Sequence, residues 1–283
     1  MPELPEVETI RRQLAPRLEG RVLQRVEIRD ARWTRPEDPA LVQAALTGRR
    51  VESLGRRGKY MDWVLDGDGH LLIHLRMTGT LLYDASVEPL HTRVRFFLDD
   101  GHELLYVDAR RFGTGHLLEG SAARDAYLAA RLGVEPLGPE FTTAVLRDRA
   151  RGRRQPIKSF LLDQRTVAGV GNIYADEALH RAGIHPLRPA GKLTTAQLAR
   201  LRDTVVEALA AGLDAGGATI DDYRDVDGAR GAFQDEFLVH LRAGEPCPTC
   251  GTPVRKLVVG GRGTYVCERC QPRPRLRRAV KNS

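Results

Sequence analysis

The chain has 283 residues, a formal net charge of +7 and an apolar content of 42%, which is ordinary for a globular protein. It has no run of about twenty apolar residues, and its N-terminus is acidic and interrupted by prolines, so we expect neither a membrane span nor a signal peptide. A cytoplasmic protein is the default expectation. The arginine-rich positive charge favours an acidic partner such as nucleic acid, although a generally basic enzyme would have the same balance.

Residues 5–18 are predicted to form a helix, because apolar residues repeat on one face: Val7, Ile10, Leu14 and Leu18. Once Met1 is removed, Pro2 is a secondary amine with a pKa near ~8, against ~10.4 for lysine, and is therefore partly uncharged and nucleophilic. Glu3 and Glu6 would supply acids for proton transfer. The alternative is that these residues only begin the helix, where proline and acidic side chains are favourable.

Short strands are predicted from residue 21 to residue 118. The expected strands are 21–28, 50–56, 60–65, 70–74, 80–83, 94–98, 104–107 and 114–118. The segments Asp66–Gly69 and Asp99–Gly101 are typical of hairpin turns. Many short strands with close turns predict an antiparallel sandwich or barrel.

The chain then becomes helical, with helices expected at 122–131, 142–150, 156–163, 173–182 and 194–215. A segment rich in glycine and proline, 132–141, is the best domain boundary. The polar, Asp-rich stretch 216–231 is expected to be a mobile loop. The predicted domains are therefore 1–133, 134–236 with the loop 216–231, 237–271, and a short basic tail at 272–283.

All four cysteines lie near the C-terminus in the pattern C-x2-C-x16-C-x2-C: Cys247, Cys250, Cys267 and Cys270. Two such knuckles on a hairpin supply four thiolates for one tetrahedral zinc ion. The role would be structural, because four thiolates leave no open coordination position. Two disulfides are the alternative, which a cytosolic protein disfavours.

A turn between two predicted helices, 167–174, contains Gly169, Gly171 and Asn172. Its glycines allow close backbone approach, and the following helix would present its N-terminal amides to an anion such as a DNA phosphate. Asn172 would add a contact or simply cap the helix. Cations are dense just before this turn: Arg147, Arg149, Arg151, Arg153, Arg154, Lys158 and Arg165. They favour binding to a nucleic-acid backbone over a solvated helix face.

Two loops at strand ends, 74–79 and 108–113, combine cations with the large apolar residues Met77 and Phe112. As core residues these two would need no special account. At loop tips they would wedge into a base stack, as proteins do when they hold a duplex open around an extruded base. Lys59, at a strand start, is by default a surface lysine.

Taken together, these motifs resemble the bacterial formamidopyrimidine-DNA glycosylase family, also called 8-oxoguanine DNA glycosylase. The resemblance rests on MPELPEVET at the N-terminus, KY at 59–60, HLRMTG at 74–79, DARRFG at 108–113, GVGNIYADEAL at 169–179 and the four-cysteine segment that closes with CERC at 267–270. These motifs span nearly the whole chain.

The resemblance implies an α+β, multidomain fold: an N-terminal helix with an antiparallel β-sandwich, then a helical domain with a helix–two-turn–helix element, and a β-hairpin zinc finger with one structural Zn²⁺. It implies an enzyme that excises oxidised purines from double-stranded DNA in base excision repair, with a lyase activity that cuts abasic sites by β,δ-elimination. A monomer is the default expectation.

The resemblance also implies residue roles. Pro2 would attack C1′ and form a Schiff base, Glu3 would be the acid that assists sugar-ring opening, and Glu6 would support them. Lys59 would be the proton donor in strand cleavage, and Arg262 would bind phosphate in the second elimination. Met77, Arg110 and Phe112 would fill the gap left by the flipped base. The implied backbone contacts are His91, Arg153, Lys158 and Asn172, and 216–231 would close over the oxidised purine.

The chain departs from the family pattern at three places. Ala109 replaces a frequent proline, which predicts a less rigid loop, and residues 240–242 replace a Tyr-Gly-Arg. The loop 216–231 is more acidic than expected near DNA. Two alternatives stay open: an endonuclease VIII-like enzyme for oxidised pyrimidines, which Leu4 argues against, and a non-catalytic lesion-binding protein, which a retained Met1 would favour.

Overall fold

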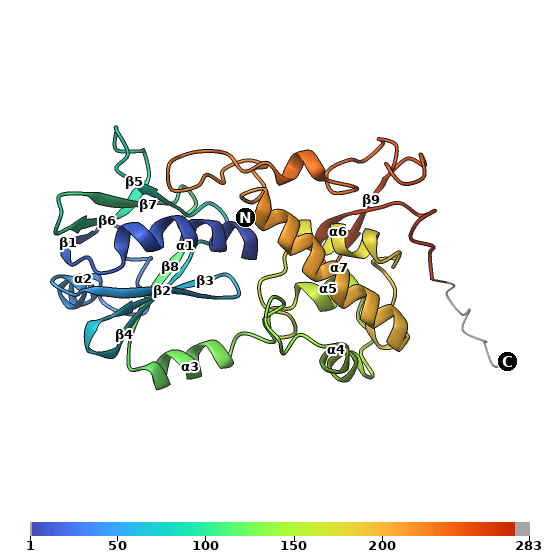
Figure 1. Cartoon of the computed structure of the whole chain (residues 1–283), viewed down its shortest axis with the longest axis horizontal. Coiled ribbons are helices and arrows are strands. Elements are labelled where there is room, and N and C mark those ends of the chain that lie inside the picture. The colour runs from blue at the N-terminus through green and yellow to red at the C-terminus, as the bar shows by residue number, and fades with distance from the viewer. Residues whose placement is uncertain (1, 275–283) are drawn as a thin grey trace. The chain divides into compact units, whose positions relative to one another are not determined.

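The computed structural model describes residues 2–274, which form two compact units (Figure 1). Unit 1 contains the chain up to Glu135 together with Leu209–Glu236, and unit 2 contains Pro136–Ala208 together with the chain from Phe237 onward. Of the basic tail predicted at 272–283, residues 275–283 lie outside the described residues, as does Met1. No helix in the described range is long and apolar enough to cross a membrane.

Unit 1 is built on two four-stranded antiparallel sheets. The first has the order β1 (Leu23–Ile28), β6 (Thr92–Leu98), β7 (Glu103–Val107) and β5 (Thr80–Tyr83). The second has the order β2 (Val51–Arg57), β3 (Tyr60–Leu65), β4 (Gly69–His74) and β8 (Thr114–Glu119). The predicted strands and the antiparallel sandwich are thus confirmed.

The core of unit 1 lies between these sheets. Alternate residues of β6 point inward, which is the period expected of a strand with one buried face. Phe96 of β6 meets Trp63 of β3 with ring centroids 5.0 Å apart, and Trp33 packs edge-on against Phe96. Because both sheets contribute aromatic residues to one cluster, the sandwich holds together without a disulfide.

Three α-helices flank the sheets of unit 1: α1 (Leu4–Leu18), α2 (Pro39–Leu46) and α3 (Ser121–Ala129). The predicted helices at 5–18 and 122–131 are confirmed within two residues. We did not predict α2, although Asp38 caps it by accepting from the Ala40 amide at 2.8 Å and Pro39 is its first residue. Residues 66–68, expected as part of a turn, form a short 3-10 helix, η1 (Asp66–Asp68).

Unit 2 contains the helices α4 (Thr143–Ala150), α5 (Ile157–Leu162) and α6 (Asn172–Arg181), the 3-10 helix η2 (Ala190–Lys192), and the hairpin of β9 (Arg255–Val259) with β10 (Arg262–Val266). The long helix α7 (Thr195–Asp214) starts in unit 2, and its last residues belong to unit 1. The predicted helical region and C-terminal hairpin are therefore confirmed.

The segment 216–231, predicted to belong with the helical region, groups with unit 1 in the structure. Tyr223 and Val226 are buried in the same core cluster as the sandwich residues, which accounts for this placement. The short 3-10 helix η3 (Phe233–Glu236) ends the inserted stretch. The predicted domain limits remain a prediction.

Candidate active site

The N-terminus of α1 gathers three of the predicted catalytic residues. The helix begins with a capping box, in which the Glu6 Oε2 atom accepts from the backbone amide of Glu3 at 2.8 Å. Pro2 is buried, and Glu3 and Glu6 are only 2% and 1% exposed. The interpretation that these residues begin the helix is therefore correct. The same cap also fixes two buried carboxylates beside Pro2, so the structural and chemical interpretations do not exclude each other.

Glu6 also connects the N-terminus to the segment 216–231. Its Oε1 atom accepts from the Ala218 amide at 2.8 Å. Gly217 has a φ of 87°, and a Cβ atom there would lie 2.9 Å from the Glu6 side chain, so this approach requires glycine. One carboxylate thus holds both the residue next to Pro2 and the start of the loop predicted to close over the base.

Helix α1 is fixed to the second sheet through Glu8. The Glu8 carboxylate accepts from Arg11, Arg12 and Arg56, and Arg56 also pairs with Glu135 at 2.8 Å. Burial raises the pKa of Glu8, but the hydrogen bonds and charges of these arginines outweigh burial and lower the pKa to about 2. Glu8 therefore stays ionised at neutral pH and keeps the helix that carries Pro2 in place.

Lys59 is not a surface lysine. It lies in the turn between β2 and β3 and is 4% exposed. Burial, followed by the charges of Arg76 and Lys59, lowers the pKa of His74 well below its ordinary value. His74 is therefore neutral at physiological pH, and its Nδ1 accepts from the Arg76 amide at 3.0 Å.

Asp108 holds the two predicted wedge loops together. Its Oδ1 atom accepts from the Thr78 hydroxyl and from the Arg110 amide, and its Oδ2 atom accepts from the amides of Phe112 and Gly113 at 2.9 and 2.8 Å. Asp108 is 1% exposed, so these bonds are formed away from water. Sequence reasoning missed this residue, although its short acidic side chain at a strand end is typical of such local bonds.

The tips of the same loops are open to solvent. Phe112 is 52% exposed and Met77 is half-buried, so Phe112 is not a core residue. The Arg110 guanidinium lies 4.9 Å from the centroid of the Phe112 ring, a cation–π contact. Arg111, with a φ of 58°, forms a two-point ion pair with buried Asp30. These bonds, with those of Asp108, hold the loop that contains Ala109, and its lower rigidity remains a prediction.

Gly113→Ala is expected to destabilise unit 1 and disturb these loops. A Cβ atom at 113 would lie 1.5 Å from the Tyr106 hydroxyl, whose ring is buried. Overpacking of this kind costs about 1–3 kcal/mol of unfolding free energy. Denaturant unfolding measures the loss. The matched control is Gly55→Ala on β2, where the nearest atoms are 3.8 Å away and no loss is expected. Equal stability of the two variants would contradict the close packing described here.

In unit 2, Arg262 is the exposed first residue of β10. It follows Gly260 and Gly261, whose φ values of 57° and 73° give the tight turn between the hairpin strands. The backbone behind it is braced, because Gly263 O accepts from Lys158 Nζ and from Asn172 Nδ2, both at 3.0 Å. The hairpin tip is thus held rigidly while the arginine side chain faces solvent.

Lys158 is fully buried, unlike the other cations of its sequence cluster. Its ammonium pairs with Asp176 at 2.7 Å and donates to the Thr264 hydroxyl at 2.8 Å. Asn172 is the first residue of α6, and Gly171 is the N-cap, so the capping interpretation of Asn172 is wrong. Backbone contacts of Lys158 and Asn172 with DNA remain a prediction.

The acidic pair Asp176 and Glu177 of α6 was not singled out from the sequence. Glu177, which is 0% exposed, accepts from the backbone amides of Leu238, Val239 and His240. Asp176 accepts from His240 Nδ1 at 2.9 Å and from the Tyr265 amide at 3.3 Å. Two adjacent acids among the apolar residues of this helix, Ile173, Ala175, Ala178 and Leu179, were the available signal. They orient the segment that leads into the hairpin.

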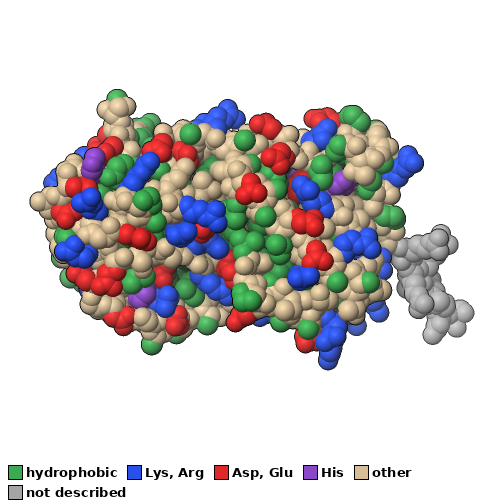
Figure 2. All heavy atoms as spheres, in the orientation of Figure 1, with side chains coloured by type: hydrophobic (Ala, Val, Ile, Leu, Met, Phe, Trp, Pro, Cys, Tyr) green, Lys and Arg blue, Asp and Glu red, His purple; other side chains and the backbone are tan. Residues whose placement is uncertain are grey.

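The other predicted DNA contacts lie at the surface. His91, with a φ of 77°, and Arg153 are both exposed, and so are Arg149 and Arg165. The turn before α6 is braced by Gln164, which accepts from the Gly169 amide and donates to Val170 O, each at 2.8 Å. On the face drawn in Figure 2, cationic and anionic side chains are interspersed, so the positive excess does not form a single patch there.

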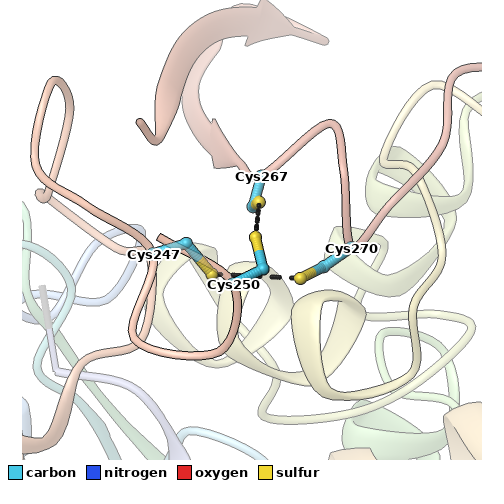
Figure 3. Close-up of side chains that lie close together, drawn as sticks. All are labelled: Cys247, Cys250, Cys267 and Cys270. Atoms are coloured by element: carbon cyan, nitrogen blue, oxygen red, sulfur yellow. Dashed lines mark hydrogen bonds between the residues drawn. The ribbon is translucent and has the colours of Figure 1, made fainter. Parts of the chain in front are cut away.

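The four cysteines form one cluster, with all four sulfur atoms within 4.8 Å of one another. They come from the chain on either side of the β9–β10 hairpin and point toward a common centre (Figure 3). The separations are 3.4 Å for Cys250–Cys267 and 3.9 Å for Cys247–Cys270, too long for the disulfide alternative. A tetrahedral zinc ion with Zn–S bonds of ~2.3 Å needs sulfurs about 3.8 Å apart, so the set fits zinc.

His180 of α6 lies against this cluster. Its Nε2 atom is 3.4 Å from Cys247 Sγ, and the side chain is buried. An imidazole N–H that donates to a thiolate offsets part of the negative charge that four thiolates bring to a dication. The helix that carries Asp176 and Glu177 therefore also supports the metal site.

Comparisons with known proteins cover almost the whole chain. Residues 1–115 match the formamidopyrimidine-DNA glycosylase N-terminal domain, residues 132–224 match its H2TH domain, and residues 244–273 match a zinc finger found in FPG and IleRS. The curated formamidopyrimidine-DNA glycosylase of Symbiobacterium thermophilum is 50% identical over 97% of this chain and 90% of its own. That of Geobacillus kaustophilus is 46% identical over 96% of this chain and 100% of its own.

Solved structures of proteins from the same family have the same fold as this chain. The MutM (Fpg) protein of Thermus thermophilus superposes with a TM-score of 0.86 at 43% identity, covering 95% of this chain and 98% of that one. A Lactococcus lactis FPG (MutM) bound to DNA containing Fapy-dG gives a TM-score of 0.88 at 34% identity, with 96% and 100% of the two chains covered. On these matches of sequence and fold, the chain belongs to the formamidopyrimidine-DNA glycosylase family.

Proposed function

We propose that this protein is a base-excision repair DNA glycosylase with an associated abasic-site lyase activity, which removes 8-oxoguanine and formamidopyrimidines from duplex DNA. The observation that carries the proposal is the buried group at the start of α1. There Glu3 and Glu6 are held beside Pro2, and Glu6 also binds the segment 216–231. This arrangement supports a nucleophile, an acid and a base-covering loop acting on one nucleotide.

In the proposed first step, the uncharged Pro2 nitrogen attacks C1′ of the damaged nucleotide. The new N–C1′ bond forms as the glycosidic bond breaks, and the proton that the Pro2 nitrogen gives up balances the one that the departing base takes. Glu3 gives a proton to the ring oxygen O4′ as the sugar opens, which leaves a cationic iminium between Pro2 and C1′. The secondary amine suits this step, because its pKa near ~8 leaves part of it unprotonated at neutral pH.

In the proposed lyase steps, the iminium acidifies the 2′ hydrogen. Water takes this proton, the C3′–O3′ bond breaks with its electron pair left on O3′, and Lys59 would give a proton to the departing 3′ phosphate. A second elimination breaks the C5′–O5′ bond, and the exposed Arg262 binds the phosphate that departs. Hydrolysis finally frees Pro2. The proposed zinc ion, held by the four cysteines, supplies folding energy to the hairpin that carries Arg262.

The proposed partner is double-stranded DNA. Helix α6 begins at Asn172 with Gly171 as its N-cap, and the positive end of its dipole would favour a phosphate of the backbone. Exposed His91 and Arg153 would contact the backbone, and Met77, Arg110 and Phe112 would fill the gap left by the extruded base. For the buried Lys158 and for Asn172, we propose that they act by holding Gly263 next to Arg262. We further propose a monomer located in the cytoplasm, on nucleoid DNA.

A panel of duplexes tests the substrate class. Single-turnover rates are compared for 8-oxoguanine, a formamidopyrimidine and thymine glycol at the same position. We expect the two purine lesions to be released at least tenfold faster than the pyrimidine. Faster release of thymine glycol would favour the endonuclease VIII-like alternative, and binding without any base release would favour a lesion-binding protein.

A further inference from the structure

Two of the four acidic residues of the segment 216–231, Asp225 and Asp227, contact α1. Asp225 Oδ2 accepts from Gln13 Nε2 at 2.9 Å, and Asp225 Oδ1 accepts from the Ala229 amide at 2.7 Å. Asp227 forms a two-point ion pair with Arg17, with N–O distances of 2.6 and 2.9 Å. Two of the four acidic side chains that were unexpected near DNA are thus bound by one face of the N-terminal helix.

The backbone of the same stretch is joined to unit 1 as well. Tyr83 at the end of β5 donates its amide to Val226 O at 2.9 Å, and Val226 donates its own amide to Gln13 Oε1 at 3.3 Å. The Thr80 hydroxyl donates to Arg224 O at 3.0 Å. Val226 is fully buried in the sandwich core. The limb 223–229 is therefore a fixed part of unit 1.

The preceding residues are held differently. Thr219 is buried, and its hydroxyl donates to Tyr223 O at 3.1 Å and accepts from the Gly231 amide at 3.0 Å. Between Thr219 and Tyr223 the side chains emerge: Ile220 is 37% exposed, and Asp221 and Asp222 are exposed. The segment thus has a short exposed tip, 220–222, and the residues on either side of the tip are held by hydrogen bonds.

We propose that Gln13 and Arg17, with Asp225 and Asp227, form a clamp that makes them specificity-determining positioning residues for the damaged base. The clamp fixes the limb 223–229, so that only the tip 220–222 adjusts when a base is bound. This inference rests on the proposed function, in which 216–231 covers the base. No base is present at an abasic site, so strand cleavage there needs no clamp.

The two parts of the clamp differ in strength. The Arg17–Asp227 pair is partly exposed, with side chains 32% and 53% accessible, so salt screens it and it contributes little alone. The bonds of Gln13 are partly buried and include the backbone of Val226. A test must therefore remove both partners on α1 together.

The test compares Gln13→Ala/Arg17→Ala with a matched control, Gln24→Ala/Arg21→Ala, which removes the same residue types from the same unit. Arg21 pairs with Asp100 at 3.0 Å, outside the clamp. For the clamp variant we expect the single-turnover rate on 8-oxoguanine duplex to fall about tenfold. Cleavage of a preformed abasic site should stay within about twofold of the wild type. The control should change neither rate.

A charge swap checks the ion pair. Arg17→Asp with Asp227→Arg should recover a larger share of the 8-oxoguanine rate than either single substitution, and the difference should shrink at high salt. Equal losses of rate on 8-oxoguanine and abasic DNA would mean a general defect of folding. No loss of rate on either substrate would mean that these surface contacts do not affect catalysis. Either result would overturn the clamp.

Limited trypsin digestion separates the clamp from the proposed function. Arg224 and Arg230 lie in and just after the limb, so release of the limb should speed cleavage there at least fivefold in the clamp variant and not in the control. If the wild type fails to release 8-oxoguanine, the proposed function falls and the specificity role falls with it. Unchanged digestion, with normal wild-type excision, overturns the clamp alone.

Discussion

Glu3→Gln is expected to slow release of 8-oxoguanine by about 10²- to 10⁴-fold, the range typical of the loss of one general acid. Glutamine keeps the size of the side chain but cannot give the proton that the opening sugar ring needs. Glu3 is 2% exposed, which limits replacement of that proton by one from bulk water. Single-turnover kinetics on a duplex with one lesion measure the chemical step directly.

The matched control is Glu19→Gln at the other end of α1. Glu19 Oε1 accepts from the Leu54 amide at 2.8 Å, so the change alters a structural carboxylate of the same helix. We expect its excision rate to stay within about twofold of the wild type. If Glu3→Gln lost less than tenfold, or if both variants lost equally, the role of Glu3 as the acid would be wrong.

Removal of the metal should have the second large effect. The finger has a very small core of its own, consisting of Val239, Cys247, Val254, Tyr265 and Cys267. Such a segment depends on metal binding to fold, and structural zinc supplies apparent binding energies of about 10–16 kcal/mol in finger peptides. Cys267→Ser is therefore expected to lose the bound zinc, unfold the hairpin and weaken duplex binding at least 100-fold.

Metal analysis and fluorescence anisotropy with labelled duplex measure the two losses together. Thr252→Ser, in the first cysteine knuckle, is the control and should keep both zinc and affinity. Zinc added after chelation should restore binding of the wild type but not of Cys267→Ser. Full duplex affinity in a zinc-free protein would show that the finger does not position Arg262 on DNA.

Local patterns in the sequence were enough for most of the fold. The strands at 60–65 and 80–83 were predicted at their observed limits, because short apolar runs bounded by turn residues are local signals. Cysteine spacing likewise predicts the cluster, since two knuckles and a hairpin leave little freedom. The helix α2 was missed even though its cap and first-turn proline are visible in the sequence.

Contacts between distant residues could not be predicted in the same way. Gln13 and Asp225 are 212 positions apart, and tertiary contacts such as the packing of Val226 into the sandwich bring them together. The burial of Lys158 could not be predicted from the sequence either, because it depends on Asp176 in the next helix and on Thr264 in the hairpin. From sequence alone, a lysine within a run of arginines is predicted to be an exposed cation. The residues that pair with it are brought close only by the tertiary structure.

The central claim is that Pro2, freed of Met1, is the nucleophile. Borohydride added during the reaction reduces an iminium to a stable amine, so the wild type should become covalently trapped on duplex DNA that carries 8-oxoguanine or an abasic site. Mass spectrometry of the proteolysed adduct should then find the sugar remnant on an N-terminal peptide that begins at Pro2. Attachment at Lys59 or any other lysine, or an active protein that keeps Met1, would contradict this account.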